Sequence, residues 1–108
     1  LEATSEGISF DAVTPLGKIV ISSPLIGTHN AYNILAAIGA GVSQEVPLAA
    51  LQRGIEKLRG VPGRLERVEA GQPFKVYVDF AHTEDALQEV LSSLRPFTSG
   101  RIILVFGC

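Results

Sequence analysis

Cysteine, methionine and tryptophan are almost absent from this sequence of 108 residues, which has one cysteine, Cys108, and neither of the other two. A lone cysteine cannot close a disulfide within the chain. A small secreted scaffold held by disulfide bonds is therefore excluded, and the cytoplasm is the expected compartment. With only two histidines, His29 and His82, a zinc site of cysteine and histidine would also need a carboxylate ligand, and no ligand pair has the usual spacing.

Long apolar runs and an excess of one charge are also missing. No apolar run approaches the length of about 20 residues that is needed to cross a bilayer. The N-terminal residues also lack the basic segment followed by an apolar segment that is typical of a signal peptide. Nine Lys and Arg residues against 11 Asp and Glu residues give a net charge of −2, which offers no basic field for nucleic acid. The apolar fraction of 46% is too high for a disordered chain. The composition therefore predicts one globular domain, or parts of two, without a membrane or nucleic-acid partner.

The first half of the chain is predicted to form a hairpin followed by two helices. β-Branched residues fill 8–14 and 18–22 on either side of a Pro-Leu-Gly turn, which is typical of a β-hairpin. Apolar residues then recur at helical spacing in the Ala-rich segment 29–41, and a second helix is expected from Pro47 to Gly60. The expected apolar face of this second helix consists of Leu48, Leu51, Ile55 and Leu58.

A break follows these helices. The sequence Gly-Val-Pro-Gly-Arg at 60–64 separates a helical block from a block that alternates between strands and helices. We therefore expect a domain boundary in this segment, with one domain over 1–62 and the next over 63–108. The chain has no starting methionine and ends directly after an apolar run, which predicts a piece of a longer protein.

A right-handed βαβ unit is expected after the boundary. Residues 65–70 and 74–80 have the composition of strands around a Gly-Gln-Pro turn, and 84–95 has helical spacing. The continuous apolar run at 102–106 is typical of a strand buried on both faces of a parallel sheet. Strand 74–80, helix 84–95 and strand 102–106 together make the unit.

The expected helix at 84–95 carries its own start and stop signals. Thr83 is suited to cap it, Glu84 and Asp85 complement the helix dipole in its first turn, and Pro96 stops it. Its buried stripe is expected to consist of Leu87, Val90, Leu91 and Leu94.

Two asparagines are the first candidate ligand-binding residues. Asn30 and Asn33 lie three residues apart at a helix start, so both amides project from one face. A carboxamide offers a donor and an acceptor together, which matches the edge of an adenine. The alternative is a capping role, because asparagine is common where helices begin. The neighbouring His29 is interpreted as a structural histidine.

Three further candidates follow the boundary. Arg64 lies in a rigid turn, where its planar fork suits phosphate or ribose oxygens; the alternative is a surface ion pair with Glu66. Asp79 and His82 lie at the carboxyl end of a predicted strand, the edge where open α/β sheets bind ligands. The alternative is that Asp79 and Thr83 only organise the turn and cap the helix. Neither GxxxxGK[ST] nor GxGxxG occurs, so if the protein uses ATP, its triphosphate-binding loop is expected outside this chain.

Taken together, four stretches resemble the Mur ligase family of ATP-dependent amide ligases. They are Thr-Pro-Leu-Gly at 14–17, LIGTHNAYNILAAIGAG at 25–41, VPGRLERVEAGQPFKVYVDFAHTEDALQEVL at 61–91, and RIILVFGC at 101–108. The resemblance implies an α/β fold, with the end of the central ATPase-like domain over 1–62 and the start of the Rossmann-like C-terminal domain over 63–108.

The resemblance also implies roles for the candidate residues. Asn30 and Asn33 match the asparagines that contact adenine in the family, and Arg64 matches the junction arginine that reaches the nucleotide. Asp79 matches the aspartate that holds the ribose, and His82 lies in the same nucleotide-binding loop. The chain is thus expected to supply the adenosine half of an ATP site.

The family reaction sets the expected substrates. The nearest members add the third amino acid, diaminopimelate or lysine, to the dipeptide of UDP-N-acetylmuramoyl-L-alanyl-D-glutamate in peptidoglycan synthesis. They use ATP to form an acyl phosphate, with Mg²⁺ neutralising the phosphates. The Mg²⁺ ligands are expected outside this chain, which by itself is expected to be inactive.

Two residues depart from the family pattern, and other functions remain as alternatives. Phe80 stands where the family usually has tyrosine and so lacks a hydroxyl group, and Glu84 stands where it usually has proline. The alternatives are another Mur-type ligase, folylpolyglutamate synthase, cyanophycin synthetase, or a non-catalytic binding domain of the same fold.

Overall fold

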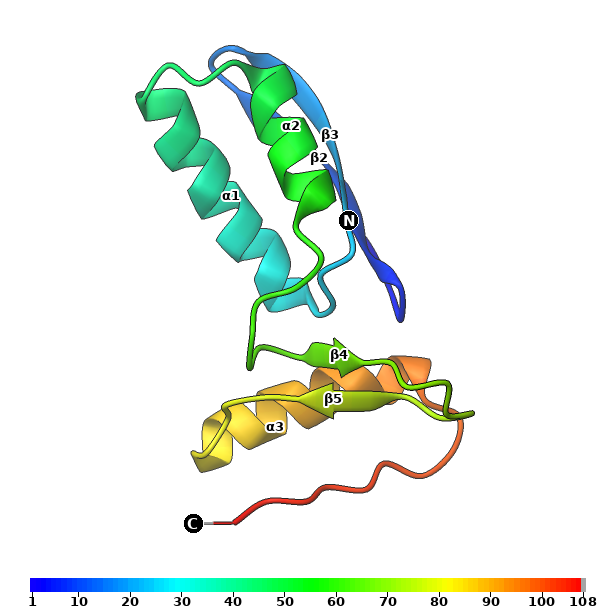
Figure 1. Cartoon of the computed structure of the whole chain (residues 1–108). Helices are drawn as coiled ribbons and strands as arrows, with labels where there is room; N and C mark the ends of the chain where they lie inside the picture. The colour runs from blue at the N-terminus through cyan, green and yellow to red at the C-terminus, as the bar shows by residue number, and fades with distance from the viewer. Residues whose placement is uncertain (108) are drawn as a thin grey trace.

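The computed structural model describes residues 1–107, which form two lobes joined by a short connecting segment (Figure 1). The N-terminal lobe consists of β1 (Glu2–Thr4), β2 (Gly7–Thr14), β3 (Gly17–Ser23), α1 (Thr28–Ser43) and α2 (Leu48–Lys57). The C-terminal lobe consists of β4 (Glu66–Val68), β5 (Val76–Val78), α3 (Glu84–Leu94) and the 3₁₀ helix η1 (Arg95–Phe97). None of the helices within 1–107 is long and apolar enough to cross a membrane.

The expected hairpin is confirmed as β2 and β3, which pair antiparallel with Thr14 opposite Gly17. The Thr14 hydroxyl closes the turn, because it donates to the Gly17 carbonyl at 2.8 Å and accepts from the Leu16 amide at 3.1 Å. The short strand β1, which the pattern did not predict, pairs antiparallel with the other edge of β2.

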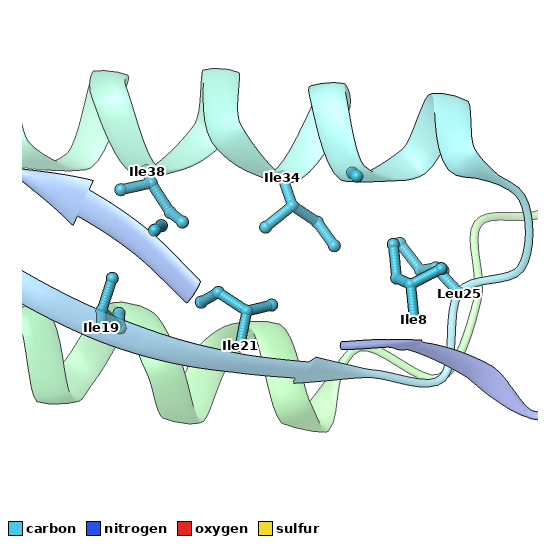
Figure 2. Close-up of a cluster of buried hydrophobic side chains, with 8 residues drawn as sticks. Ile8, Ile19, Ile21, Leu25, Ile34 and Ile38 are labelled. Atoms are coloured by element: carbon cyan, nitrogen blue, oxygen red, sulfur yellow. The ribbon is translucent and has the colours of Figure 1, made fainter. Parts of the chain in front are cut away.

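The core of the N-terminal lobe lies where α1 and α2 pack against this sheet (Figure 2). Alternate residues of β3 are buried while those between them are exposed, as a half-buried strand requires. The core cluster consists of Ile8, Ala12, Ile19, Ile21, Leu25, Ala31, Ile34 and Ile38, with Leu48, Leu51 and Ile55 of α2 packed against it.

Both helices of this lobe end at positions other than those expected. α1 continues through Gly41 to Ser43, because Gly41 is a contact point with α2 and not a stop. A Cβ atom at Gly41 would overlap the Leu51 side chain. α2 ends at Lys57, so Leu58 lies beyond the helix and is 46% exposed, and its expected place on the apolar face is wrong.

The two strands expected after the boundary are confirmed but shorter. β4 and β5 pair antiparallel, with Arg67 opposite Tyr77. α3 is confirmed with its cap: the Thr83 hydroxyl accepts a hydrogen bond from the Ala86 amide at 3.3 Å, and Glu84 and Asp85 lie in the first turn. The helix ends just before Pro96, which lies in η1.

The expected strand at 102–106, and with it the βαβ unit, is wrong for this structure. The segment is not paired with β5, and Ile103 and Val105 are 76% and 89% exposed. A strand of this kind needs a neighbour for its hydrogen bonds and a layer on each face, and no described element supplies them. For the same reason the apolar stripe of α3, expected to be buried, is only half-buried.

Candidate functional site

Asn30 is buried at the start of α1, where it ties the helix to the segment before it. Its side-chain Nδ2 donates to the Ile26 carbonyl at 2.7 Å, and its exposed fraction is only 6%. The N-cap position is occupied by Gly27, whose φ of 91° suits glycine, and no side chain caps the helix. Neither asparagine is therefore an N-cap, so the capping alternative is wrong.

Asn33 lies one turn further along α1 and is exposed. Its Nδ2 donates to Oδ1 of Asn30 at 3.1 Å, so the buried amide fixes the orientation of the exposed one. The Oδ1 atom and the second Nδ2 hydrogen of Asn33 have no recorded partner within residues 1–107. The pair thus presents one amide with a donor and an acceptor to its surroundings.

His29 packs beside this pair and close to Gly27. A Cβ atom at Gly27 would lie 2.6 Å from Cε1 of His29, so the glycine makes room for the ring. The Nδ1 atom of His29 is buried and has no hydrogen-bond partner among the described residues.

The segment that joins the lobes ends in a tight turn around Gly63 and Arg64. The Arg64 amide donates to the Val61 carbonyl at 3.0 Å, and the Gly63 amide donates to Oε2 of Glu66 at 2.9 Å. The Arg64 side chain is exposed and forms no ion pair with Glu66 or with any other described residue. The ion-pair alternative for Arg64 is therefore wrong, because the Glu66 carboxylate is engaged by the backbone.

Asp79 connects the end of β5 to this turn. Its Oδ2 accepts from the Leu65 amide at 2.7 Å, and its Oδ1 accepts from the Ala81 amide at 2.8 Å. The Phe80 amide also donates to the Gly63 carbonyl at 2.8 Å. The turn and the loop after β5 are thus fixed to one another, and Asp79 does organise the loop as its alternative interpretation expected.

His82 lies in the same loop with its side chain exposed. Its Nδ1 is 2.9 Å from the Phe80 carbonyl oxygen. Its ring meets the Phe80 ring edge-on, with the centroids 5.3 Å apart. Phe80 is itself 68% exposed, so this aromatic pair lies on the surface beside Asp79.

The structure therefore brings three of the five candidates together. Arg64, Asp79 and His82 share one corner of the C-terminal lobe, whereas Asn30 and Asn33 lie at the start of α1 in the other lobe. No hydrogen bond or ion pair joins the two groups within 1–107. A cavity of about 270 Å³ lies between the lobes, lined by Gly27 and Thr28 at the start of α1 and by Ser92, Ser93 and others on α3 and η1. The start of α1 thus faces the C-terminal lobe.

Leu65 is a residue of this corner that the sequence pattern did not reveal. It is 5% exposed and has a positive φ of 44°, which is rare for a side chain with a Cβ atom. The hydrogen bond from its amide to Asp79 spans 14 residues, so no local signal could have indicated it.

An ion cluster around Glu6 was also unpredicted. Oε2 of Glu6 is 2.8 Å from Nη1 of Arg67, and Oε1 is 2.9 Å from Nζ of Lys75; Arg67 also pairs with Glu69. The hydrogen bonds from Lys75 and Arg67 hold the pKa of the Glu6 carboxyl at about 2, against an ordinary 4.5. The same Glu6 contact raises the pKa of Arg67. No group of three His, Cys, Asp or Glu side chains within 1–107 is placed to hold a metal ion.

Two family models match the chain in succession. The model described as the Mur ligase middle domain matches residues 1–41, and the one described as the Mur ligase glutamate ligase domain matches residues 63–108.

Individual proteins agree with these models. The chain is 44% identical over all of its 108 residues to a protein of Bacillus licheniformis named UDP-N-acetylmuramoyl-L-alanyl-D-glutamate–2,6-diaminopimelate ligase. A solved structure with the same ligase name is 36% identical over 99% of the chain, with a TM-score of 0.71. The crystal structure of MurF from Acinetobacter baumannii covers 90% of the chain with a TM-score of 0.79 and 23% identity, which supports the fold alone.

The chain spans about a fifth of the length of these proteins: 22% of the Bacillus protein and of the solved ligase, and 21% of the Acinetobacter chain. Within that span, the match to the middle domain comes before the match to the glutamate ligase domain. The chain belongs to the Mur ligase family.

Proposed function

We propose that the chain is the part of a cytoplasmic amide ligase that binds the adenosine half of ATP, with a domain boundary between residues 62 and 63. The whole enzyme joins diaminopimelate to UDP-N-acetylmuramoyl-L-alanyl-D-glutamate in peptidoglycan synthesis. The name of the Bacillus protein, which is 44% identical over the full chain, supports this substrate pair over the lysine alternative.

The observation that carries the proposal is the fixed corner formed by Arg64 and Asp79. Each carboxylate oxygen of Asp79 accepts one backbone hydrogen bond, from Leu65 or from Ala81. Because a carboxylate oxygen has two lone-pair directions, each oxygen keeps one for a further donor. Two adjacent ribose hydroxyls are donors of that kind. The geometry therefore lets Asp79 hold a ribose without giving up its structural bonds.

Arg64 supplies the positive charge of this corner. Its guanidinium group is exposed and forms no ion pair within the described chain, so it is available to bind an anionic ligand. Arginine binds phosphate and ribose oxygens through two parallel hydrogen bonds, which a lysine ammonium cannot reproduce.

The asparagine pair supplies the base contact. In the proposed site Asn33 presents its free acceptor and donor to the adenine edge. Asn30 contributes by holding Asn33 in place, since its own amide is buried and bonded at both ends. His82 lies on the loop beside the ribose contact, where its exposed ring borders the nucleotide.

In the whole enzyme ATP supplies the phosphoryl group that activates the substrate carboxylate for attack by the amine of the diamino acid. Mg²⁺ would neutralise the phosphate charge in that chemistry, and residues 1–107 gather no cluster of side chains that would hold it. The role of this chain is to bind and orient the nucleoside.

Replacing Arg64 tests this function in the full-length protein. Arg64→Lys is expected to raise the KM for ATP about tenfold, because a point charge replaces a planar fork. The melting temperature should not change, since the side chain has no hydrogen bond or ion pair to lose in the part of the chain that the structure describes. The assay is release of inorganic phosphate in the presence of the UDP-linked dipeptide and diaminopimelate.

The matched control is Arg53→Lys, on an exposed position of α2 in the same chain. This variant is expected to keep the KM of the parent protein. An Arg64→Lys variant with an unchanged KM for ATP would contradict the role of Arg64. A parent protein that releases no phosphate with both substrates present would overturn the ligase itself.

A further inference from the structure

The ion cluster around Glu6 joins residues that belong to different lobes. Glu6 lies in the turn between β1 and β2, whereas Arg67 is on β4 and Lys75 directly precedes β5. Figure 1 shows this turn, in dark blue, reaching from the N-terminal lobe toward the β4–β5 pair. The two contacts span 61 and 69 residues of sequence.

The turn holds Glu6 in a defined place. The Glu6 amide donates to the Thr4 hydroxyl oxygen at 3.1 Å, and this hydroxyl donates to the Gly7 carbonyl at 3.2 Å. Gly7 has a φ of 149°, and a Cβ atom there would overlap the carbonyl oxygen of Ser23. The backbone on both sides of Glu6 is therefore held, so little further backbone entropy is lost when its carboxylate pairs with the two cations.

The carboxylate uses one oxygen for each cation. Oε2 faces Nη1 of Arg67 at 2.8 Å and Oε1 faces Nζ of Lys75 at 2.9 Å. Glu69, on the C-terminal lobe, occupies another face of the Arg67 guanidinium and holds it in orientation. The contact is thus a bridge from one carboxylate to two cations on the opposite lobe.

We propose that Glu6 is a positioning residue: its bridge to Arg67 and Lys75 is an ionic latch that keeps the C-terminal lobe in register with the start of α1. The latch sets the relation between Asn33 on one lobe and the Arg64–Asp79 corner on the other, which the connecting segment alone does not set. The consequence for ATP rests on the proposed function, whereas the latch itself rests on the contacts.

The ion pairs of the latch are exposed to solvent and therefore weak. The Glu6 side chain is 66% exposed and those of Arg67 and Lys75 are 35% and 42% exposed, so water and salt reach all three. Exposed ion pairs are weak and are screened at high ionic strength. Its opening releases the only ion pairs between the lobes among the described residues.

The test uses Glu6→Gln, which removes the charge and keeps the shape, in the full-length protein. Spin labels on the exposed residues Gln44 and Gln88 report the distance between the lobes by pulsed electron paramagnetic resonance. A broader distance distribution is expected for the variant, and for the parent protein in about 0.5 M NaCl. Salt should change the variant no further, because the charge it screens is already gone.

Two comparisons make the result specific. Glu2→Gln, on the exposed strand β1, is the matched control and should leave the distribution unchanged. The double variant Arg67→Gln/Lys75→Gln should reproduce Glu6→Gln, and combining all three changes should add nothing further, as expected for groups that act as one unit.

The kinetic readout is the KM for ATP, which should rise about threefold or more in Glu6→Gln while kcat is kept. A distance distribution identical to that of the parent protein would overturn the latch. A broadened distribution with an unchanged KM would overturn the positioning role. A parent protein without ATP-dependent activity would overturn the proposed function only, since the distance measurement decides on the latch by itself.

Discussion

Asp79 is a residue with two uses at once. Its two oxygens hold the Leu65 and Ala81 amides, which shapes the junction, and its remaining lone pairs are those proposed for the ribose. A substitution of Asp79 would change both stability and ligand binding, so experiments have to measure the two effects separately. Arg64 and Asp79 allow this, because the Arg64 side chain has no hydrogen bond or ion pair to lose within residues 1–107.

We expect Asp79→Asn to lower the free energy of unfolding and to raise the KM for ATP together. An amide has only one acceptor oxygen, so one of the two backbone amides would face an N–H group, at a cost of about 1–3 kcal/mol. Urea unfolding and steady-state kinetics measure the two effects. Asp85→Asn is the control: it lies exposed in the first turn of α3 and should cost about 0.3–1 kcal/mol through the helix dipole alone. Equal stability of the two variants would contradict the structural role of Asp79.

At the scale of elements, the turns determine how the strands of the N-terminal lobe pack together. β1 and β3 flank β2 in one sheet, and Gly7 begins β2 where the chain passes close to Ser23. The close approach has no space for a side chain, and the backbone conformation there also suits glycine. Gly39, in the exposed part of α1, has nothing within 4 Å of the place a Cβ atom would take.

These two glycines should therefore respond in opposite directions to alanine. Gly7→Ala is expected to lower the free energy of unfolding by about 2–3 kcal/mol through strain and overlap. Gly39→Ala should raise it by up to about 1 kcal/mol, because alanine has the higher helix propensity. Chemical denaturation followed by circular dichroism measures both. A Gly7→Ala variant as stable as Gly39→Ala would show that the β1–β2 turn adapts freely.

Elements defined by near neighbours in sequence were predicted well. The hairpin of β2 and β3, the capped helix α3 and the β4–β5 pair follow from turn residues, capping residues and alternation within a few positions. The run at 102–106 shows the limit of such patterns, since its apolar residues indicate what the segment would bury but not whether a neighbour is present. Ile103 and Val105 are exposed because no described element covers them.

At the scale of the whole molecule, the relation between the lobes depends on a few exposed charges. The pKa of the Glu6 carboxyl is about 2, because Lys75 and Arg67 donate hydrogen bonds to its charged form. A carboxyl group whose pKa is lowered on folding gives its full stabilisation to the folded arrangement at any pH above its ordinary pKa. That contribution is lost as the pH falls.

The Glu6 contribution should therefore be complete above a pH of 4.5 and disappear as the pH falls toward about 2. A carbon-detected NMR titration of the Glu6 carboxyl group is expected to show this low midpoint. In Lys75→Gln the midpoint should move up toward 4.5, because the largest cause of the shift is removed. An unchanged midpoint in Lys75→Gln, or one near 4.5 in the parent protein, would contradict the bridge between the lobes.

The sequence by itself determined most of the local elements, the family motifs and the identity of the candidate residues, because each of these depends on residues that are close along the chain. Tertiary structure decided which of their atoms remain available. It buried Asn30 and left Asn33 exposed to solvent. It also engaged Glu66 with the backbone and left Arg64 without an ion pair among the described residues. It also joined Glu6 to Lys75 across 69 residues. Hydrogen bonds and ion pairs depend on distances in space, and a pattern in sequence carries no information about a partner so far away.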